Sequence, residues 1–539
     1  MAQYDYVIVG AGAAGCVLAA RLSADPAVSV CLVEAGGDDR HPFIHMPRGI
    51  AKLVRMPSHI YVYLTEPEAR TGMKPDIWLR GKVLGGSTSV NGMVWVRGTP
   101  GDYADLAETM GDDWAWPHIG AAFRDIEHHQ LGAGPDRGAN GPLRISVPSE
   151  RSALTEAILS AGAAMGWPVA EDINQPADDV SSGFMPRTIW KGRRQSAAKA
   201  FLKPVMGRGN LTVLTGLTTD KVLFDGTRAI AIEAIDAAGA RREIAARREV
   251  ILCGGAIASP AILERSGIGD PSRLAELGIP LVHASPAVGD GVSEHRSIRM
   301  QWRLKDGALS LNRNYQGWRL PLSVLRYYLL HDGPMSSAAI EMRLAFRSRP
   351  ELARSDIQAQ IGLYSWDMAS AGGLETTPGF CAVAYAIRPS SRGSIHITAR
   401  DPIAPPIARP NFHATNEDRA VMLSAARQLR DWAAQEPLAR LIAAETAPGA
   451  AAQSDEAIFD AIDQYGAAGM HTVGSCRMGR DPGSVVDPAM RVRGVSGLRV
   501  MDASVFPFIP AGNTQAPVMA MAWRAAEVIA CDQALSRQA

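Results

Sequence analysis

The chain has 539 residues, of which 47% are hydrophobic and 20% are charged, a composition that excludes a largely disordered protein. One compact core rarely extends over this length, so we expect two or three structural units in one polypeptide. Lysine plus arginine and aspartate plus glutamate number 55 each, so no overall charge favours nucleic acid or an anionic membrane, although a local basic patch is compatible with this balance.

The first elements along the chain predict a βαβ unit. Residues 5–9 and 28–33 are apolar runs typical of buried strands, and residues 14–24 have the pattern of a helix. The next stretch, residues 36–99, is punctuated by proline and glycine and has little regular periodicity. Because so long an irregular segment is unusual as a plain loop, we expect it to wrap around a bound cofactor.

Later elements predict a return to this sheet and then a second sheet. Residues 211–224 and 248–253 resemble further strands, and residues 260–265 a short helix after a Gly-Gly turn. Between about residues 293 and 465 alternating stretches with Trp and Arg are mixed with helices, which predicts an antiparallel sheet. A helix over residues 518–529 closes the chain.

The cysteines and the hydropathy bear on location. The six cysteines lie far apart without CxxC pairs or zinc-type spacing, so we expect free thiols and no metal site. Free thiols suit a reducing compartment. No apolar run reaches the roughly 20 residues that cross a bilayer, and strand-like residues begin at Asp5, which leaves no room for a secretion signal. We therefore expect a cytoplasmic protein with no membrane span and no nucleic-acid partner.

Residues 10–15, GAGAAG, form a GxGxxG turn between the first strand and the first helix. Gly10 permits the tight turn, Gly12 lets the backbone approach a pyrophosphate, and Gly15 allows the helix to pack closely on the strand. Glu34 ends the second strand and would accept hydrogen bonds from ribose hydroxyls. A carboxylate there would repel a 2′-phosphate, which disfavours NADP but leaves NAD and FAD open.

Three later blocks resemble diagnostic segments of the glucose-methanol-choline (GMC) oxidoreductase family. Residues 81–93 read GKVLGGSTSVNGM, residues 255–269 read GAIASPAILERSGIG, and residues 471–479 read HTVGSCRMG. The resemblance runs from residue 2 to about residue 530. Within the family, the chain most resembles the bacterial choline dehydrogenase and sorbose dehydrogenase-like branch.

The resemblance implies FAD as the cofactor and an α/β fold, in which a Rossmann-type FAD-binding domain is joined to a second α+β substrate domain built on an antiparallel sheet. The FAD-binding domain is expected to comprise residues 1–155, 196–292 and 466–539, the last part carrying the catalytic residues. The substrate-binding domain is expected to comprise residues 156–195 and 293–465.

The expected cofactor-binding residues fall into two groups. The Rossmann turn and the second strand supply Gly10, Gly12, Ala13, Ala14, Gly15, Glu34 and Ala35. The family resemblance implies Val83, Gly85, Ser89, Asn91, Gly92, Met93 and Val94 near the flavin, Val222 on the adenine side, Asp502 and Ala503 by the pyrophosphate, and Asn513 and Thr514 before the last helix.

Two departures from the family pattern affect the cofactor. Members that attach FAD covalently carry a histidine where this chain has Val90, so we expect non-covalent FAD. Many relatives have Trp at the position of Tyr61, so we expect the packing against the flavin face to differ here.

His471 is the expected catalytic base. Alcohol oxidation requires removal of the hydroxyl proton as hydride leaves carbon, and an imidazole with an ordinary pKa near ~6.5 accepts that proton around neutrality. In the resembling family this histidine has that role, and its partner, here Asn513, orients the substrate oxygen. The helix expected after Asn513 would direct its positive dipole end at negative charge on a reduced flavin.

Several other histidines are assigned structural places, with His41, His45 and His59 in the stretch 36–99. His128 and His129 are expected on a solvated helix face, and His295 is expected to cap packing near a domain junction.

The predicted function is FAD-dependent oxidation of an alcohol, of the primary alcohol, polyol or sugar class, with oxygen or a quinone-type carrier as electron acceptor. The alternative within the family is a non-redox lyase that uses FAD structurally and cleaves cyanohydrins. An NAD-dependent dehydrogenase and a catalytically inactive dinucleotide sensor are further alternatives. The sequence leaves open which alcohol is oxidised.

Overall fold

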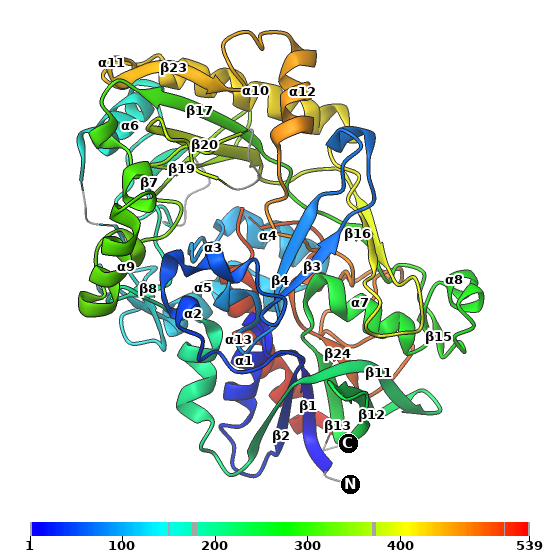
Figure 1. Cartoon of the computed structure of the whole chain (residues 1–539). Helices are drawn as coiled ribbons and strands as arrows, with labels where there is room; N and C mark the ends of the chain where they lie inside the picture. The colour runs from blue at the N-terminus through cyan, green and yellow to red at the C-terminus, as the bar shows by residue number, and fades with distance from the viewer. Residues whose placement is uncertain (1–2, 149–150, 175–179, 369–372, 511, 537–539) are drawn as a thin grey trace.

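The structure is a computed structural model that describes residues 3–148, 151–174, 180–368, 373–510 and 512–536. Two large sheets organise the chain (Figure 1). A mainly parallel sheet lies near both termini, and an antiparallel sheet lies at the opposite end of the molecule.

The mainly parallel sheet contains the predicted βαβ unit. Across its parallel part run β10 (Leu211–Thr215), β2 (Val30–Glu34), β1 (Gln3–Val9) and β13 (Arg241–Leu252), with β24 (Leu498–Val500) beside β13. β12 (Arg228–Asp236) and β11 (Leu217–Asp225) continue it as antiparallel strands. The carboxyl ends of β1, β2, β13 and β24 share one edge, which is where ligands bind in sheets of this kind.

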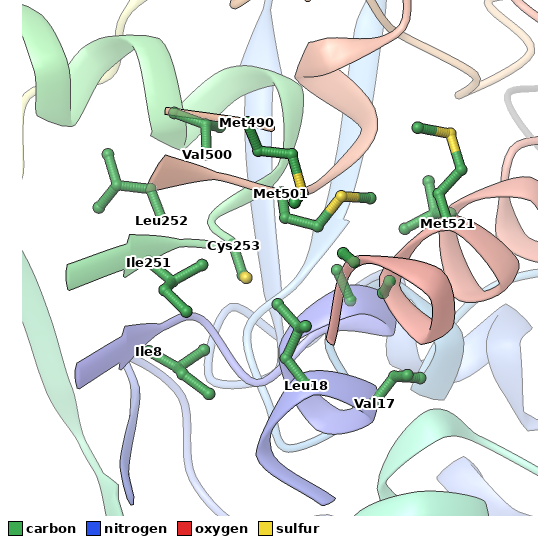
Figure 2. Close-up of a cluster of buried hydrophobic side chains, with 14 of the residues drawn as sticks. Ile8, Val17, Leu18, Ile251, Leu252, Cys253, Met490, Val500, Met501 and Met521 are labelled. Carbon is green, nitrogen blue, oxygen red and sulfur yellow. The ribbon is translucent and has the colours of Figure 1, made fainter. Parts of the chain in front are cut away.

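Helices α1 (Ala13–Leu22) and α13 (Gln515–Ser536) pack together against this sheet. Figure 2 shows Ile8, Leu252 and Val500 of the strands beside Leu18 of α1 and Met521 of α13, all of them buried. Strands covered on both faces become continuous apolar runs, and β2 is buried at every residue. This core fixes the starting points of both helices at the same sheet edge.

The predicted second sheet is confirmed as a six-stranded antiparallel sheet. Its order is β23 (Ile442–Ala447), β17 (Ile298–Leu304), β20 (Gly379–Ala386), β19 (Ile357–Gly362), β18 (Met342–Phe346) and β7 (Ser181–Phe184). Alternate residues such as Ile298, Met300 and Trp302 pack in a core with α6 (Ala153–Ala164), α10 (Asn416–Ala433) and α12 (Asp455–Tyr465). The intervening residues face the other way and form the inner face, which lies toward the first sheet.

Two expectations from the sequence are wrong. The stretch 36–99 contains regular elements: α2 (Pro42–His45), α3 (Ile50–Leu53) and a hairpin of β3 (Ile60–Leu64) and β4 (Ile77–Gly81). His128 and His129 lie on strand β5 (Glu127–His129), and His129 is only 3% exposed. Elements this short carry too few residues to show a clear periodicity.

The other elements connect or cover these sheets. The helices are α4 (Pro100–Met110), α5 (Trp116–Ile126), α7 (Gly255–Arg265), α8 (Pro271–Glu276), α9 (Arg319–Leu330) and α11 (Leu438–Leu441). The strands are β6 (Leu143–Ile145), β8 (Ile189–Trp190), β9 (Arg193–Arg194), β14 (Ile268–Gly269), β15 (His283–Ala284), β16 (Asp290–Val292), β21 (Gly393–His396) and β22 (Ile407–Arg409). The six cysteines are free thiols, as expected. Over the described ranges, no helix combines the length and apolarity needed to cross a bilayer.

Candidate active site

The GxGxxG turn sits at the shared carboxyl edge of the strands. Gly10 has φ +100°, and a Cβ at this position would lie 2.5 Å from the carbonyl oxygen of Cys253. A Cβ on Gly15 would lie 1.9 Å from the carbonyl oxygen of Gly10. Side chains are therefore excluded at both positions, and α1 starts directly against the ends of β1 and β13.

The glycine-rich block around residue 85 lies on this turn. The Gly85 N–H donates to the carbonyl of Ala11 at 2.7 Å, and a Cβ on Gly86 would lie 2.7 Å from the Cα of Gly12. Ser89 donates its hydroxyl to the carbonyl of Leu84 at 2.7 Å, which closes the block into a tight turn. Two segments that are more than 70 residues apart thus form one backbone-lined surface.

The start of α1 suits a phosphate. A Cβ on Gly12 would meet no atom of the protein within 4 Å, so the backbone at the N-terminus of α1 is accessible. Ala13 and Ala14 begin the helix, where the first N–H groups lack intrahelical partners. Small residues, accessible N–H groups and the positive end of the helix dipole form the usual cradle for a pyrophosphate.

Two buried acids flank this cradle. Glu34 is 6% exposed and accepts the N–H groups of Ala11 and Gly36 at 2.9 Å each. Burial raises the pKa of Glu34 to about 7, and these backbone donors oppose the rise. Asp502 accepts the Gly255 N–H at 2.8 Å and the Ser259 hydroxyl at 2.6 Å, so it caps the start of α7.

Of the other expected cofactor residues, Ala35, Val83 and Ala503 lie at the same edge, whereas Val222 lies on β11. Ala35 directly follows Glu34, Val83 bridges to Gly37, and Ala503 starts a short turn after Asp502. Val222 lies on β11 and donates its N–H to the Ser266 hydroxyl at 2.8 Å. Taken together, an accessible helix start, a glycine surface and an acid near the second strand fit an FAD dinucleotide.

Asn91, Gly92, Met93 and Val94 form a turn held by an arginine that the sequence did not suggest. The Asn91 side-chain oxygen accepts the Met93 N–H at 3.0 Å and Nη1 of Arg194 at 2.8 Å. Arg194 is 1% exposed and also donates to the carbonyl of Ile44 at 2.9 Å. Asn91 Nδ2 donates to Gln515, which is the first residue of α13 and follows Thr514.

His471 and Asn513 are brought together as the sequence predicts for a catalytic pair. Asn513 Nδ2 lies 2.9 Å from Nε2 of His471, and α13 begins two residues after Asn513. On its other side, Nδ1 of His471 lies 2.9 Å from Nδ1 of His295. His295 therefore contacts the proposed base, a place that sequence reasoning missed. Its only signal was its position beside the irregular start of the second sheet.

The hydrogen bonds determine which nitrogen of each imidazole carries the proton. The carbonyl of Ile387 lies 2.8 Å from Nε2 of His295 and accepts only, so this Nε2 is protonated and Nδ1 is an acceptor. Nδ1 of His471 then donates to His295, and Nε2 of His471 keeps a lone pair that accepts from Asn513. The lone pair of His471 thus points toward the amide that would hold a substrate oxygen.

Burial keeps both imidazoles neutral. Burial lowers the pKa of His471 well below its ordinary value, and the proximity of His295 and Arg80 lowers it further. Burial also lowers the pKa of His295 to about 4. A Cβ on Gly469 would lie 2.8 Å from Nδ1 of His471 and 2.9 Å from Cβ of His295, so this glycine leaves room for the two rings to meet.

The inner face of the antiparallel sheet orients Asn513. Its side-chain oxygen accepts from Nε2 of Gln358 at 3.2 Å and from Nε2 of Gln360 at 3.3 Å. Gln358 in turn accepts Nε of Arg343 at 2.6 Å, and its Nε2 donates to the Tyr385 hydroxyl at 2.5 Å. The Asn513 amide is therefore held with Nδ2 toward His471. In the sequence, the feature that indicated this positioning role was the alternation of Gln358 and Gln360 with apolar residues in β19.

A buried carboxylate holds the His471 backbone. Glu294 accepts the N–H of His471 at 2.8 Å and the N–H of His295 at 2.9 Å, and it also accepts the Thr472 hydroxyl. Arg80 of β4 lies 3.8 Å from Glu294 and donates to Thr472 at 2.6 Å. The same acid thus holds the backbones of both histidines at the junction of the two sheets.

The fold and this site define an FAD-dependent oxidoreductase that acts on CH–OH groups. Two family profiles, both described as GMC oxidoreductase, match residues 4–297 and 389–522. The chain belongs to the GMC oxidoreductase family, as the resemblance implied.

Relatives extend over nearly the whole chain. The chain is 36% identical to an oxygen-dependent choline dehydrogenase from Chromohalobacter salexigens, over 99% of this chain and 96% of that protein. It is 35% identical to an alcohol dehydrogenase [acceptor] from Pseudomonas putida, over 98% of this chain and 96% of that protein. Among solved structures, pyridoxine 4-oxidase from Mesorbium loti is similar with a TM-score of 0.87 and 30% identity, over 97% of this chain and 98% of the other.

Proposed function

We propose that the protein oxidises an alcohol to an aldehyde or ketone, with His471 as the base and Asn513 as the residue that positions the substrate oxygen. The observation that carries the proposal is the unprotonated Nε2 of His471, which lies 2.9 Å from the Asn513 amide. A substrate hydroxyl that replaces this direct contact would donate to Nε2 and accept from Nδ2. FAD, when bound, supplies the hydride acceptor.

The residues around the pair favour this reaction. The neutral His471 takes the hydroxyl proton on Nε2 while its Nδ1–H continues to donate to His295. Asn513, held by Gln358 and Gln360, keeps the oxygen in line as the proton leaves. The first N–H groups of α13, which lack intrahelical partners, would stabilise negative charge on the bound cofactor.

We assign the cofactor to the segments 1–155, 196–292 and 466–539 and the substrate to 156–195 and 293–465. Val90 lies where covalent members carry an attaching histidine, so we propose that FAD is bound non-covalently.

The acceptor of the electrons is proposed to be oxygen or a quinone-type carrier, and the location to be the cytoplasm. The relatives named above carry oxidoreductase names, which favours redox chemistry over the lyase alternative.

The test is anaerobic mixing of the holoenzyme with a panel of alcohols while the flavin absorbance is recorded. An alcohol substrate should bleach the flavin, and His471→Ala should slow bleaching by about 10² to 10⁴ without loss of FAD. His118→Ala, at an exposed position on α5, is the matched control and should leave the rate unchanged. Bleaching of His471→Ala at the parental rate would refute the assigned base, and cyanohydrin cleavage without bleaching would favour the lyase.

A further inference from the structure

The inner face of the antiparallel sheet leads from Asn513 to a group of cationic and aromatic side chains. Gln360, which donates to Asn513, pairs across the sheet with Val383, and Val383 pairs on its other side with Arg299 of β17. Neighbouring strands are ~4.8 Å apart, so the Cα of Arg299 lies about 10 Å from that of Gln360. Arg299 is therefore on the same face as the catalytic pair and within reach of a small substrate.

A second arginine joins Arg299. The Arg299 guanidinium lies 5.7 Å from the ring centroid of Trp366, and the Arg48 guanidinium lies 5.3 Å from that of Tyr364. Burial raises the pKa of the Cys381 thiol to about 11, and the positive charges of Arg299 and Arg48 both oppose this rise. Both guanidiniums thus lie near Cys381, which precedes Val383 by two residues and shares its face.

Neither guanidinium is in close contact with a described acidic residue. Over the ranges that the structure describes, neither Arg48 nor Arg299 forms an ion pair within 4.0 Å, and Nε and Nη2 of Arg48 are buried without a hydrogen-bond partner. Arg296, three residues before Arg299, shows the contrast because it is paired with Asp76 at 2.8 Å. Both side chains are only partly exposed, and cations withdrawn from water are ordinarily paired, so two of them facing a substrate site favour an anion from outside the protein.

We propose that Arg48 and Arg299 bind a carboxylate carried by the alcohol substrate. This inference rests on the proposed function and names the substrate class of the same site. The hydroxyl would bind at His471 and Asn513, and the carboxylate would lie several bonds away beside the two arginines. The rings of Tyr364 and Trp366 would pack against an apolar or aromatic spacer. Choline, a cationic alcohol, would instead meet two like charges.

Three alcohols that share a benzyl alcohol core and differ in the para substituent test this subsite: para-(hydroxymethyl)benzoate, benzyl alcohol and para-(hydroxymethyl)benzyltrimethylammonium. Anaerobic stopped-flow with the holoenzyme gives the Kd and the limiting rate of flavin reduction for each. The carboxylate should bind about 10- to 100-fold more tightly than benzyl alcohol, which is the range expected for hydrogen bonds to a charged group. Tighter binding of the cationic alcohol would overturn the proposal.

The variants Arg299→Gln and Arg48→Gln should remove most of this preference, measured as the ratio of the Kd of benzyl alcohol to that of the carboxylate. Arg303→Gln is the matched control, because Arg303 lies on the same strand, is 43% exposed and approaches Glu375 at 3.8 Å. An unchanged preference in both arginine variants would overturn the subsite. Binding of para-methylbenzoate, which has no hydroxyl, is followed through the flavin spectrum and tests the subsite without turnover. Failure of all three alcohols to bleach the flavin would instead refute the proposed function.

A separate observation concerns the outer surface of α9. Trp318, Leu322, Leu325 and Leu329 recur at the spacing of one helix face and are exposed by 71%, 53%, 54% and 70%. The opposite side of α9 is docked: Tyr327 is 2% exposed and donates its hydroxyl to the carbonyl of His45 at 3.1 Å. The helix is therefore anchored to the rest of the protein, at the left-hand side of Figure 1, and its outermost stripe is apolar.

Basic residues lie at both ends of this apolar stripe. Arg319 is adjacent to Trp318, with its guanidinium 5.4 Å from the Trp318 ring. At the other end, the exposed residues Lys191 and Arg193 flank Gly192, where a Cβ would lie 1.7 Å from the carbonyl oxygen of His331. The acidic residue Asp332 is paired with Arg326 at 2.6 Å. An apolar helix face with a basic rim is typical of helices that lie in the interface of an anionic bilayer.

The geometry points to docking of α9 on an anionic lipid surface, with the apolar stripe inserted among the acyl chains. A second copy fits less well, because two such faces would oppose their basic rims. The test is sedimentation of the holoenzyme with vesicles of phosphatidylglycerol and phosphatidylcholine. The variant Leu325→Gln/Leu329→Gln should reduce the bound fraction at least about tenfold, and added salt should weaken binding of the parent.

Leu281→Gln is the matched control, because Leu281 is 52% exposed and lies near β15, away from α9. This control should bind vesicles like the parent. Equal binding of the parent and the double variant would overturn the proposal, and so would a dimer in size-exclusion chromatography that the double variant dissociates.

Discussion

His295 offers the most direct test of how the structure prepares the base. The substitution His295→Phe keeps an aromatic ring in the place that stacks on Tyr385 at a centroid distance of 4.3 Å, but it removes the acceptor of the His471 Nδ1–H. A buried donor left without a partner costs about 1 to 3 kcal/mol, and each 1.4 kcal/mol corresponds to about tenfold. The proton of His471 would then shift toward Nε2, the nitrogen that must accept the substrate proton.

We therefore expect anaerobic flavin reduction by a saturating alcohol to fall about 10- to 100-fold in His295→Phe. His295→Gln should recover part of this loss, because the amide offers an acceptor to His471 and a donor to the carbonyl of Ile387. Stopped-flow absorbance at several pH values measures both rates, and the FAD content of each variant reports on folding. A parental rate in His295→Phe with full FAD content would refute the inferred tautomer.

Four further predictions address the cofactor, the catalytic pair and stability. Glu34→Ala should weaken FAD retention measured by ultrafiltration, while the reconstituted enzyme reduces its flavin at nearly the parental rate; unchanged affinity would remove Glu34 from the site. Acid precipitation should release intact FAD, because Val90 cannot attach it, and flavin on the pellet would contradict this. Asn513→Ala should slow flavin reduction less than His471→Ala, and the double variant should lose less than the sum of both free energies; simple additivity would argue against a shared oxygen. Burial lowers the pKa of His413 to about 4, whereas its value in the unfolded chain is about 6.5. Because the folded state then binds fewer protons than the unfolded state, the urea midpoint of unfolding should fall as pH decreases from about 6.5 to about 4. His413→Asn should reduce this pH dependence, and a urea midpoint that stays constant over this range would contradict the prediction.

The pH dependence of the reaction follows from the same burial. An ordinary imidazole would make flavin reduction rise through an apparent pKa near ~6.5. Because burial lowers the pKa of His471 well below that value, the rise should lie at more acidic pH, and the rate should be constant around neutrality.

The sequence by itself determined the features that depend on neighbours along the chain. The turn from Gly10 to Gly15 required glycine because backbone atoms approach there to within contact distance, and that requirement is visible as a motif. The periodicity of apolar residues was sufficient to predict the βαβ unit and the change to an antiparallel sheet. It failed for short elements such as β5, in which the partner strand rather than the local pattern decides the conformation.

Only the tertiary structure decided which polar side chains meet. His295 and His471 are separated by 176 residues along the chain, and Gln358 and Asn513 by 155, so no local spacing in the sequence predicts either contact. The tautomer of His471, the orientation of Asn513 and the grouping of Arg48 with Arg299 depend on strand register and on the docking of two sheets. Register places alternate residues of a strand on one face, but only packing selects the residues of distant segments that this face will contact.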